Sequence, residues 1–141
     1  MKQHLHFITL GVHNLAAMKK WYQEKFGWTP MKEMEGIAFF NLNGLIFGLF
    51  PTEELGKDIG VKSDGSGFKR FSLAINFGSE KEIDDVVADL RSKGVQVIKE
   101  PQKVFWGGYH AYVSDPEENF WELAYNPFLH MDQSGNIITH D

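Results

Sequence analysis

The sequence contains two similar segments, each an apolar extended stretch followed by an amphipathic helix that ends at a glycine. The first is ITLGV followed by a helix from Asn14 to Gly27, and the second is FSLAINF followed by a helix from Ser79 to Gly94. The starts and the ends of the two helices are separated by nearly the same number of residues, which indicates duplication of one supersecondary unit. We therefore predict two copies of a strand–helix–strands module, and we expect a ligand site between the copies.

The composition favours a single domain that spans residues 1–141. A chain of 141 residues that is 43% hydrophobic can bury one core. A net charge of −5 disfavours nucleic acid and anionic membranes as partners. The absence of cysteine excludes disulfides, a thiolate nucleophile and Cys-bound metal. The sequence shows no signal peptide and no apolar run of membrane-spanning length, so we expect a cytoplasmic protein.

Module one covers about residues 4–50. Its first predicted strand runs from His4 to Val12, and alternation places Phe7, Thr9 and Gly11 on the face opposite the helix. Asn14 is a good N-cap for the helix, and Gly27 provides its left-handed stop. Residues 38–42 and 45–50 read as a hairpin around Asn43-Gly44, a strong turn signal.

Module two covers about residues 68–127. Ser79 and Glu82 form a capping box in front of its helix. Strands are predicted at 95–99, 108–113 and 120–126, with the turn DPEEN between the last two. The linker 51–67 is expected to contain a short helix from Thr52, and the tail 128–141 to form either a small hairpin around Ser134-Gly135 or an ordered arm.

The segment DPEENFWEL at the end of module two, with the repeated order strand–helix–three strands, resembles the vicinal oxygen chelate superfamily. This superfamily includes glyoxalase I, bleomycin-resistance proteins and extradiol dioxygenases, and its motif is D-P-D-G-N/H-x-x-E-L. Glu118 stands where the motif has glycine. The last part of module two is similar to a bacterial subgroup whose members mostly lack an assigned reaction. The resemblance implies an α+β fold of two β-α-β-β-β modules, which form a curved, cup-shaped mixed sheet with helices outside, and a homodimer.

The resemblance also implies four positions where metal-dependent members hold a divalent ion. In this sequence they fall on Phe7, near Phe47, on Ser72 and on Glu122, while His6 lies one residue from the first position and on the other face. Only Glu122 can ligate a metal in the family pattern, and one carboxylate cannot hold a divalent ion alone. We therefore expect no metal cofactor. A divalent metal that uses Glu122 and a displaced ligand stays open.

Alternation predicts which side chains line the cup. Glu122 faces inward, and the DPEEN turn places His110 and Tyr112 on the same face of the neighbouring strand. The other expected lining residues are the aromatic Phe7 and Phe47, the polar Thr9, Ser72 and Asn76, and Trp106. An aromatic wall with a few polar groups is typical of a small-molecule site.

His110 and Glu122 are the only titratable pair predicted to face inward. A carboxylate next to an imidazole orients the ring proton, which suits a general acid or base. Two other interpretations remain open: the two groups satisfy each other within the sheet, or His110 replaces a metal ligand beside Glu122.

Trp106 precedes two glycines at the rim of the predicted cup. The glycines could allow a ligand to approach the backbone, with Trp106 stacked over it as a lid. Alternatively, they form a bulge and Trp106 is part of the core.

The sequence therefore predicts a glyoxalase/bleomycin-resistance-like protein that binds a small molecule in the cup, either as a binding protein or as a metal-independent enzyme. The alternative is a divalent-metal-dependent lyase or isomerase of the glyoxalase I type that uses Glu122.

Overall fold

The computed structural model describes residues 1–32 and 34–138. The chain divides into two compact units, Met1–Phe68 and Lys69–Asp141, which we call the first and the second unit. Each unit contains one of the two predicted modules. None of the helices in the described ranges is long and apolar enough to cross a membrane.

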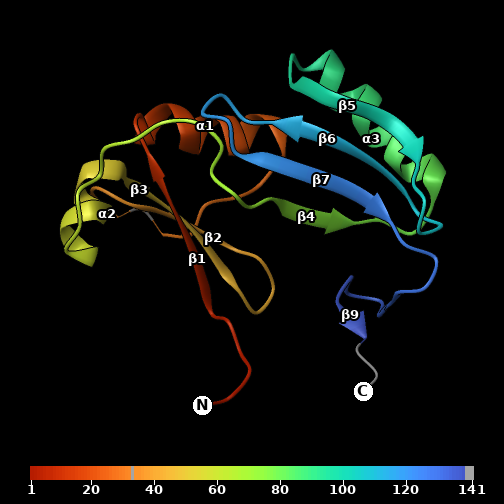
Figure 1. The fold of residues 1–141 in the computed structure, drawn as a ribbon, viewed down its shortest axis with the longest axis horizontal. Helices are drawn as coiled ribbons and strands as arrows, with labels where there is room; N and C mark the ends of the chain where they lie inside the picture. Colours follow the sequence, from red (N-terminus) through yellow and green to blue (C-terminus); the bar gives the residue numbers. More distant parts are fainter. Residues whose placement is uncertain (33, 139–141) are drawn as a thin grey trace. The chain divides into compact units, whose positions relative to one another are not determined.

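The first unit contains a three-stranded mixed sheet. Its elements in chain order are β1 Phe7–Val12, α1 Leu15–Lys25, β2 Ala38–Asn41, β3 Ile46–Pro51 and α2 Thr52–Ile59. The strand order is β1-β3-β2, with β1 parallel to β3 and β2 antiparallel to it (Figure 1). Among residues 1–32 and 34–68, this module therefore has one strand fewer than the predicted β-α-β-β-β plan.

Local sequence signals explain the ends of these elements. The side chain of Asn14 accepts a hydrogen bond of 3.0 Å from the backbone N–H of Ala17 and so caps α1. Asn43 and Gly44 have φ of 59° and 104°, as a two-residue hairpin turn requires. The predicted cap, hairpin and short linker helix from Thr52 are all confirmed.

An aromatic cluster forms the core of the first unit. Tyr22 of α1 is fully buried, and its ring centroid lies 5.2 Å from Phe47, 5.6 Å from Trp28 and 6.1 Å from Phe40. Phe47 therefore faces α1, and its predicted place on the opposite face is wrong. Gly48 takes that place, since a Cβ atom there would lie 3.1 Å from the Phe39 ring and 3.3 Å from Oγ1 of Thr9.

The second unit contains a four-stranded mixed sheet, which we call the second sheet. Its elements are β4 Leu73–Asn76, α3 Glu80–Ser92, β5 Gln96–Lys103, β6 Tyr109–Ser114 and β7 Phe120–Tyr125, followed by the small hairpin β8 His130–Met131 and β9 Ile137–Ile138. The strand order is β4-β7-β6-β5, with only β4 and β7 parallel. Helix α3 packs against β5, β6 and β7 on one face of this sheet (Figure 1). The predicted α+β class with mixed sheets is thereby confirmed.

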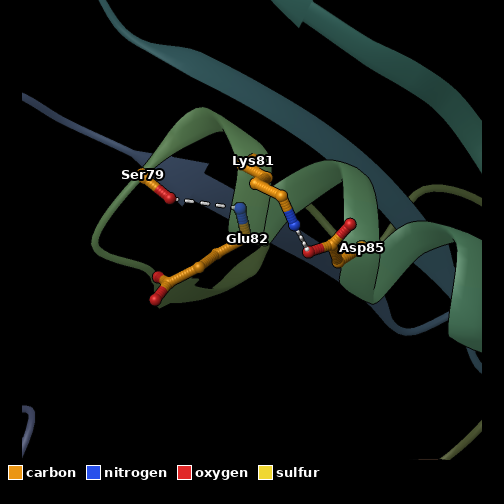
Figure 2. Close-up of polar contacts among 4 residues, drawn as sticks. All are labelled: Ser79, Lys81, Glu82 and Asp85. Atoms are coloured by element: carbon orange, nitrogen blue, oxygen red, sulfur yellow. Dashed lines mark hydrogen bonds and ion pairs between the residues drawn. The ribbon is translucent and has the colours of Figure 1, made fainter.

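The predicted capping box of α3 forms in part. Figure 2 shows the side chain of Ser79 accepting a hydrogen bond of 3.2 Å from the backbone N–H of Glu82. The carboxylate of Glu82 accepts its bond from the backbone N–H of Gly78, at 2.5 Å, rather than from Ser79. Ser79 thus caps one N–H group of the first turn, and Glu82 fixes the chain just before the N-cap.

The turn between β6 and β7 is held by a buried carboxylate. Asp115 accepts hydrogen bonds from the backbone N–H groups of Glu117 and Asn119, each 2.9 Å long, and from the Asn119 amide at 2.7 Å. Glu118 has φ of 60°, so it adopts the left-handed conformation that the glycine of the family motif would adopt without strain. This turn sets the pairing of β6 with β7.

We predict that Tyr22→Ala lowers the free energy of unfolding by about 3–5 kcal/mol, because it leaves a cavity among aromatic rings that cannot close around it. Lys20→Ala on the exposed side of α1 is the control and should change it by less than about 0.5 kcal/mol. Urea denaturation followed by tryptophan fluorescence measures both. Similar midpoints for the two variants would contradict the importance of this cluster.

Candidate functional site

Strand alternation gives the second sheet two different faces. The face toward α3 carries buried apolar side chains, among them Ala111, Val113, Trp121 and Leu123. The hydroxyl of Tyr109 marks this face, because it donates a hydrogen bond of 2.6 Å to Asp84 of α3. The opposite face, which we call the open face, carries His110, Tyr112, Glu122 and Ala124.

His110 and Glu122 form a hydrogen-bonded pair on the open face. Nδ1 of His110 lies 2.6 Å from Oε2 of Glu122, and the side chains retain 10% and 23% of their exposure. An ionised carboxylate only accepts hydrogen bonds, so Nδ1 carries the proton and donates it. In the neutral ring Nε2 is then a hydrogen-bond acceptor. The tautomer is assigned from this bonding pattern.

The Nε2 atom of His110 is buried and has no hydrogen-bond partner among residues 1–32 and 34–138. Leaving a buried polar atom without a partner costs about 1–3 kcal/mol. An ordered water or the polar group of a ligand is the usual partner of such an atom. A partner that donates a hydrogen bond to the Nε2 lone pair would therefore remove this cost.

Tyr112 lies directly opposite Glu122 in the sheet and extends the pair. Burial raises the pKa of the Tyr112 hydroxyl, and the negative charge and hydrogen bond of Glu122 raise it further, while a hydrogen bond from Ser72 lowers it. Tyr112 is therefore a neutral donor toward the Glu122 carboxylate, and Ser72 donates a hydrogen bond to the Tyr112 oxygen. The predicted residues Ser72, Tyr112, His110 and Glu122 are thus brought together in one unit.

Two alanines lie beside this pair on neighbouring strands. Ala74 of β4 pairs with Glu122, and Ala124 of β7 pairs with His110. Ala74 is exposed, so solvent reaches the part of the open face beside Glu122. Asn76 follows Ala74 on the same face of β4 and is half-buried.

The predicted residues of module one lie in the first unit. Phe7 is 51% exposed, and its ring centroid lies 6.0 Å from that of Phe39 in an edge-to-face arrangement. Thr9 shares this face with Gly48. None of these side chains is titratable, and Phe47 is in the core on the other side of the sheet.

Trp106 lies in the tight hairpin between β5 and β6, where Val104 and Gly107 are hydrogen-bonded at 3.0 Å. Its ring lies on Gly108, because a Cβ atom at Gly108 would be 1.9 Å from two ring atoms. Trp106 is half-buried and packs on this glycine of its own hairpin. The neighbouring Phe105 is fully exposed.

Sequence reasoning missed Lys69. Its Nζ donates hydrogen bonds of 2.9 Å to the backbone oxygen of Glu117 and to the side chain of Asn119. It thereby ties the start of the second unit to the turn that leads into β7, close to Ser72 in the chain. The two partners lie about fifty residues further along the chain, and no local pattern signals such a contact.

The residues present do not fit the divalent ion that the fold resemblance implies. Of the four positions named above, Phe7 and Phe47 have no donor atom, Ser72 supports Tyr112, and Glu122 is bonded to His110. Within 1–32 and 34–138 there is no group of three or more His, Asp or Glu side chains that could hold a metal ion. A stable site needs about three or four such ligands.

The family model of the Glyoxalase/Bleomycin resistance protein/Dioxygenase superfamily matches residues 4–123. The chain belongs to this superfamily. No curated protein shows significant sequence similarity to it. Its fold is similar to the crystal structure of a glyoxalase-related enzyme from Fulvimarina pelagi, with 30% identity and a TM-score of 0.86 over 99% of this chain and 100% of that one.

Two other solved structures are less similar. A glyoxalase/bleomycin resistance protein/dioxygenase from Nocardioides is 26% identical, with a TM-score of 0.78 over 89% of this chain and 84% of that one. Lactoylglutathione lyase from Agrobacterium tumefaciens is 18% identical, with a TM-score of 0.71 over 89% of this chain and 96% of that one. The latter similarity shows the fold alone.

We predict a distinct alkaline pH dependence for the contact between Tyr109 and Asp84, which anchors the helix-side face of β6. The hydrogen bond to Asp84 raises the pKa of Tyr109 to about 12 from an ordinary value of 10.0. The folded state thus favours the protonated hydroxyl, so its contribution to stability is complete below pH 10 and is lost as the pH rises toward 12. The difference in unfolding free energy between the wild type and Tyr109→Phe should shrink over this interval. A difference that is independent of pH would contradict the prediction.

Proposed function

We propose that this superfamily member binds a small molecule on the open face of the second sheet through Nε2 of His110. The supporting observation is that Nδ1 of the ring is hydrogen-bonded to Glu122, while Nε2 is buried and has no partner in the described part of the chain. A ligand group that bonds to Nε2 gains a hydrogen bond and removes the cost of the unpaired atom.

The same arrangement suits proton transfer without a metal. A neutral imidazole with a free Nε2 can take a proton from a ligand O–H, N–H or acidic C–H group. The resulting imidazolium would be stabilised by the Glu122 carboxylate at Nδ1. Tyr112, held by Ser72, would keep that carboxylate in place by donating to it. We therefore propose a metal-independent enzyme with His110 as general base and Glu122 as its partner, or a binding protein that uses the same contacts.

A thermal-shift screen of a metabolite library tests the proposal. A ligand at a hundred times its Kd stabilises a protein by about 2.7 kcal/mol, which such a screen detects. We expect ligands whose stabilising effect is lost in His110→Ala and weakened in Glu122→Gln. A library without stabilising ligands, or ligands that act equally on the wild type and both variants, would contradict the proposal.

Two matched variants serve as controls. His130→Ala removes an exposed histidine of the second unit, and Glu100→Gln removes an exposed carboxylate of β5. Both should respond to ligands like the wild type. Their spectra and those of the site variants should show the same folded state, so that lost binding is not lost folding.

Metal analysis separates this proposal from the glyoxalase I type of mechanism. We expect the purified protein to hold no stoichiometric divalent metal after growth with added nickel, zinc, manganese or iron. A stoichiometric metal that disappears in Glu122→Gln but stays in Glu100→Gln would contradict the metal-independent proposal.

We also propose that the chain forms a homodimer, since pairing is common in this superfamily. Light scattering coupled to size-exclusion chromatography tests this. A monomeric mass at micromolar concentrations would contradict it.

A further inference from the structure

The hydrogen-bond network on the open face has a defined direction. Ser72 donates to Tyr112, Tyr112 donates to Glu122, and Nδ1 of His110 also donates to Glu122. The Glu122 carboxylate accepts the bonds from Tyr112 and from His110 Nδ1. With the ring proton on Nδ1, the other ring nitrogen, Nε2, is a second acceptor at the end of the network. No proton in the network is left to offer to a ligand at Nε2.

The charge around Nε2 adds to this selectivity. The Glu122 carboxylate lies against the other nitrogen of the same ring, at 2.6 Å, and neither Tyr112 nor Ser72 brings a positive charge. A ligand carboxylate or phosphate would place acceptor oxygens against the Nε2 lone pair and a second negative charge near Glu122. An anion is therefore a poor partner for the neutral ring.

The side chains beside the pair are two alanines and an aromatic ring. The methyl groups of Ala74 and Ala124 lie on the strands that flank Glu122 and His110, and the Tyr112 ring meets the His110 ring edge to face, with centroids 5.3 Å apart. Apart from the His110–Glu122 pair and the Tyr112 hydroxyl, these groups offer a ligand few polar contacts. Ala74 is exposed, so a larger side chain there can be introduced without disturbing the core.

From these observations we infer that the ligand of this site is a neutral molecule that donates an O–H or N–H from an apolar body to His110 Nε2, and that Ala74 sets the space for that body. This inference rests on the proposed binding function. It deepens that function by naming the ligand class and a residue that determines specificity.

Matched fragment pairs test the ligand class. The probes are benzyl alcohol with benzyl methyl ether, and benzamide with N,N-dimethylbenzamide, together with benzoate as the anion. Binding is followed by the NMR shifts of the His110 ring and of the β6 and β7 backbone amides. We expect the two donor fragments to shift these signals with affinities roughly tenfold or more above those of their methylated partners and of benzoate, because only the donors satisfy Nε2.

The variant Ala74→Leu tests whether Ala74 sets the space for the apolar body of the ligand. It should abolish the shifts caused by the donor fragments while the His110 ring signals of the free protein stay as in the wild type. Ala16→Leu, at an exposed position of α1, is the control and should bind like the wild type.

The outcomes are distinguishable from failure of the proposed function. Equal binding of methylated and donor fragments, preferential binding of benzoate, or no shift with any fragment would overturn the inferred ligand class. Unchanged binding in Ala74→Leu would overturn the role of Ala74. In each case the proposed function stands if the metabolite screen still gives ligands that depend on His110.

Discussion

The hydrogen bond between Glu122 and His110 depends on the register of two strands. The residues lie on β7 and β6, and their side chains meet because Tyr112 pairs with Glu122 while His110 pairs with Ala124. A shift of one residue would turn one of them toward α3. The buried carboxylate of Asp115 holds the turn that fixes this register, and Lys69 bonds to the same turn from the start of the second unit.

The two modules share a local plan but differ in chemistry. In each unit the first strand pairs in parallel with the module's last strand, β1 with β3 and β4 with β7, and a capped helix follows the first strand. The face of the first sheet that carries Phe7, Thr9 and Gly48 has no titratable side chain among these residues. The open face of the second sheet carries His110, Tyr112 and Glu122. Any acid–base chemistry that we propose therefore comes from one copy of the duplicated module.

The sequence predicted those features that local signals determine. Asn14, Asn43-Gly44 and Ser79 marked the helix starts and the hairpin, because caps and tight turns depend on neighbouring residues. The contact between His110 and Glu122 also followed from alternation, since a short turn joins their two strands. Phe47 was misplaced because four bulky apolar residues and a glycine lie together in β3, and hydrophobicity does not show that Gly48 lies on the face opposite α1. The Lys69 contact joins residues that are 48 and 50 positions apart in the chain, so no local pattern indicates it.

The proposed role of His110 depends on which of its ring nitrogens carries the proton. Long-range proton–nitrogen NMR correlations of the neutral ring in the wild type, assigned with His110→Ala, measure this directly. We expect Nδ1 to be protonated and Nε2 not, and we expect this tautomer to be less populated in Glu122→Ala. A ring protonated at Nε2 in the wild type, or a tautomer unaffected by loss of Glu122, would contradict the account.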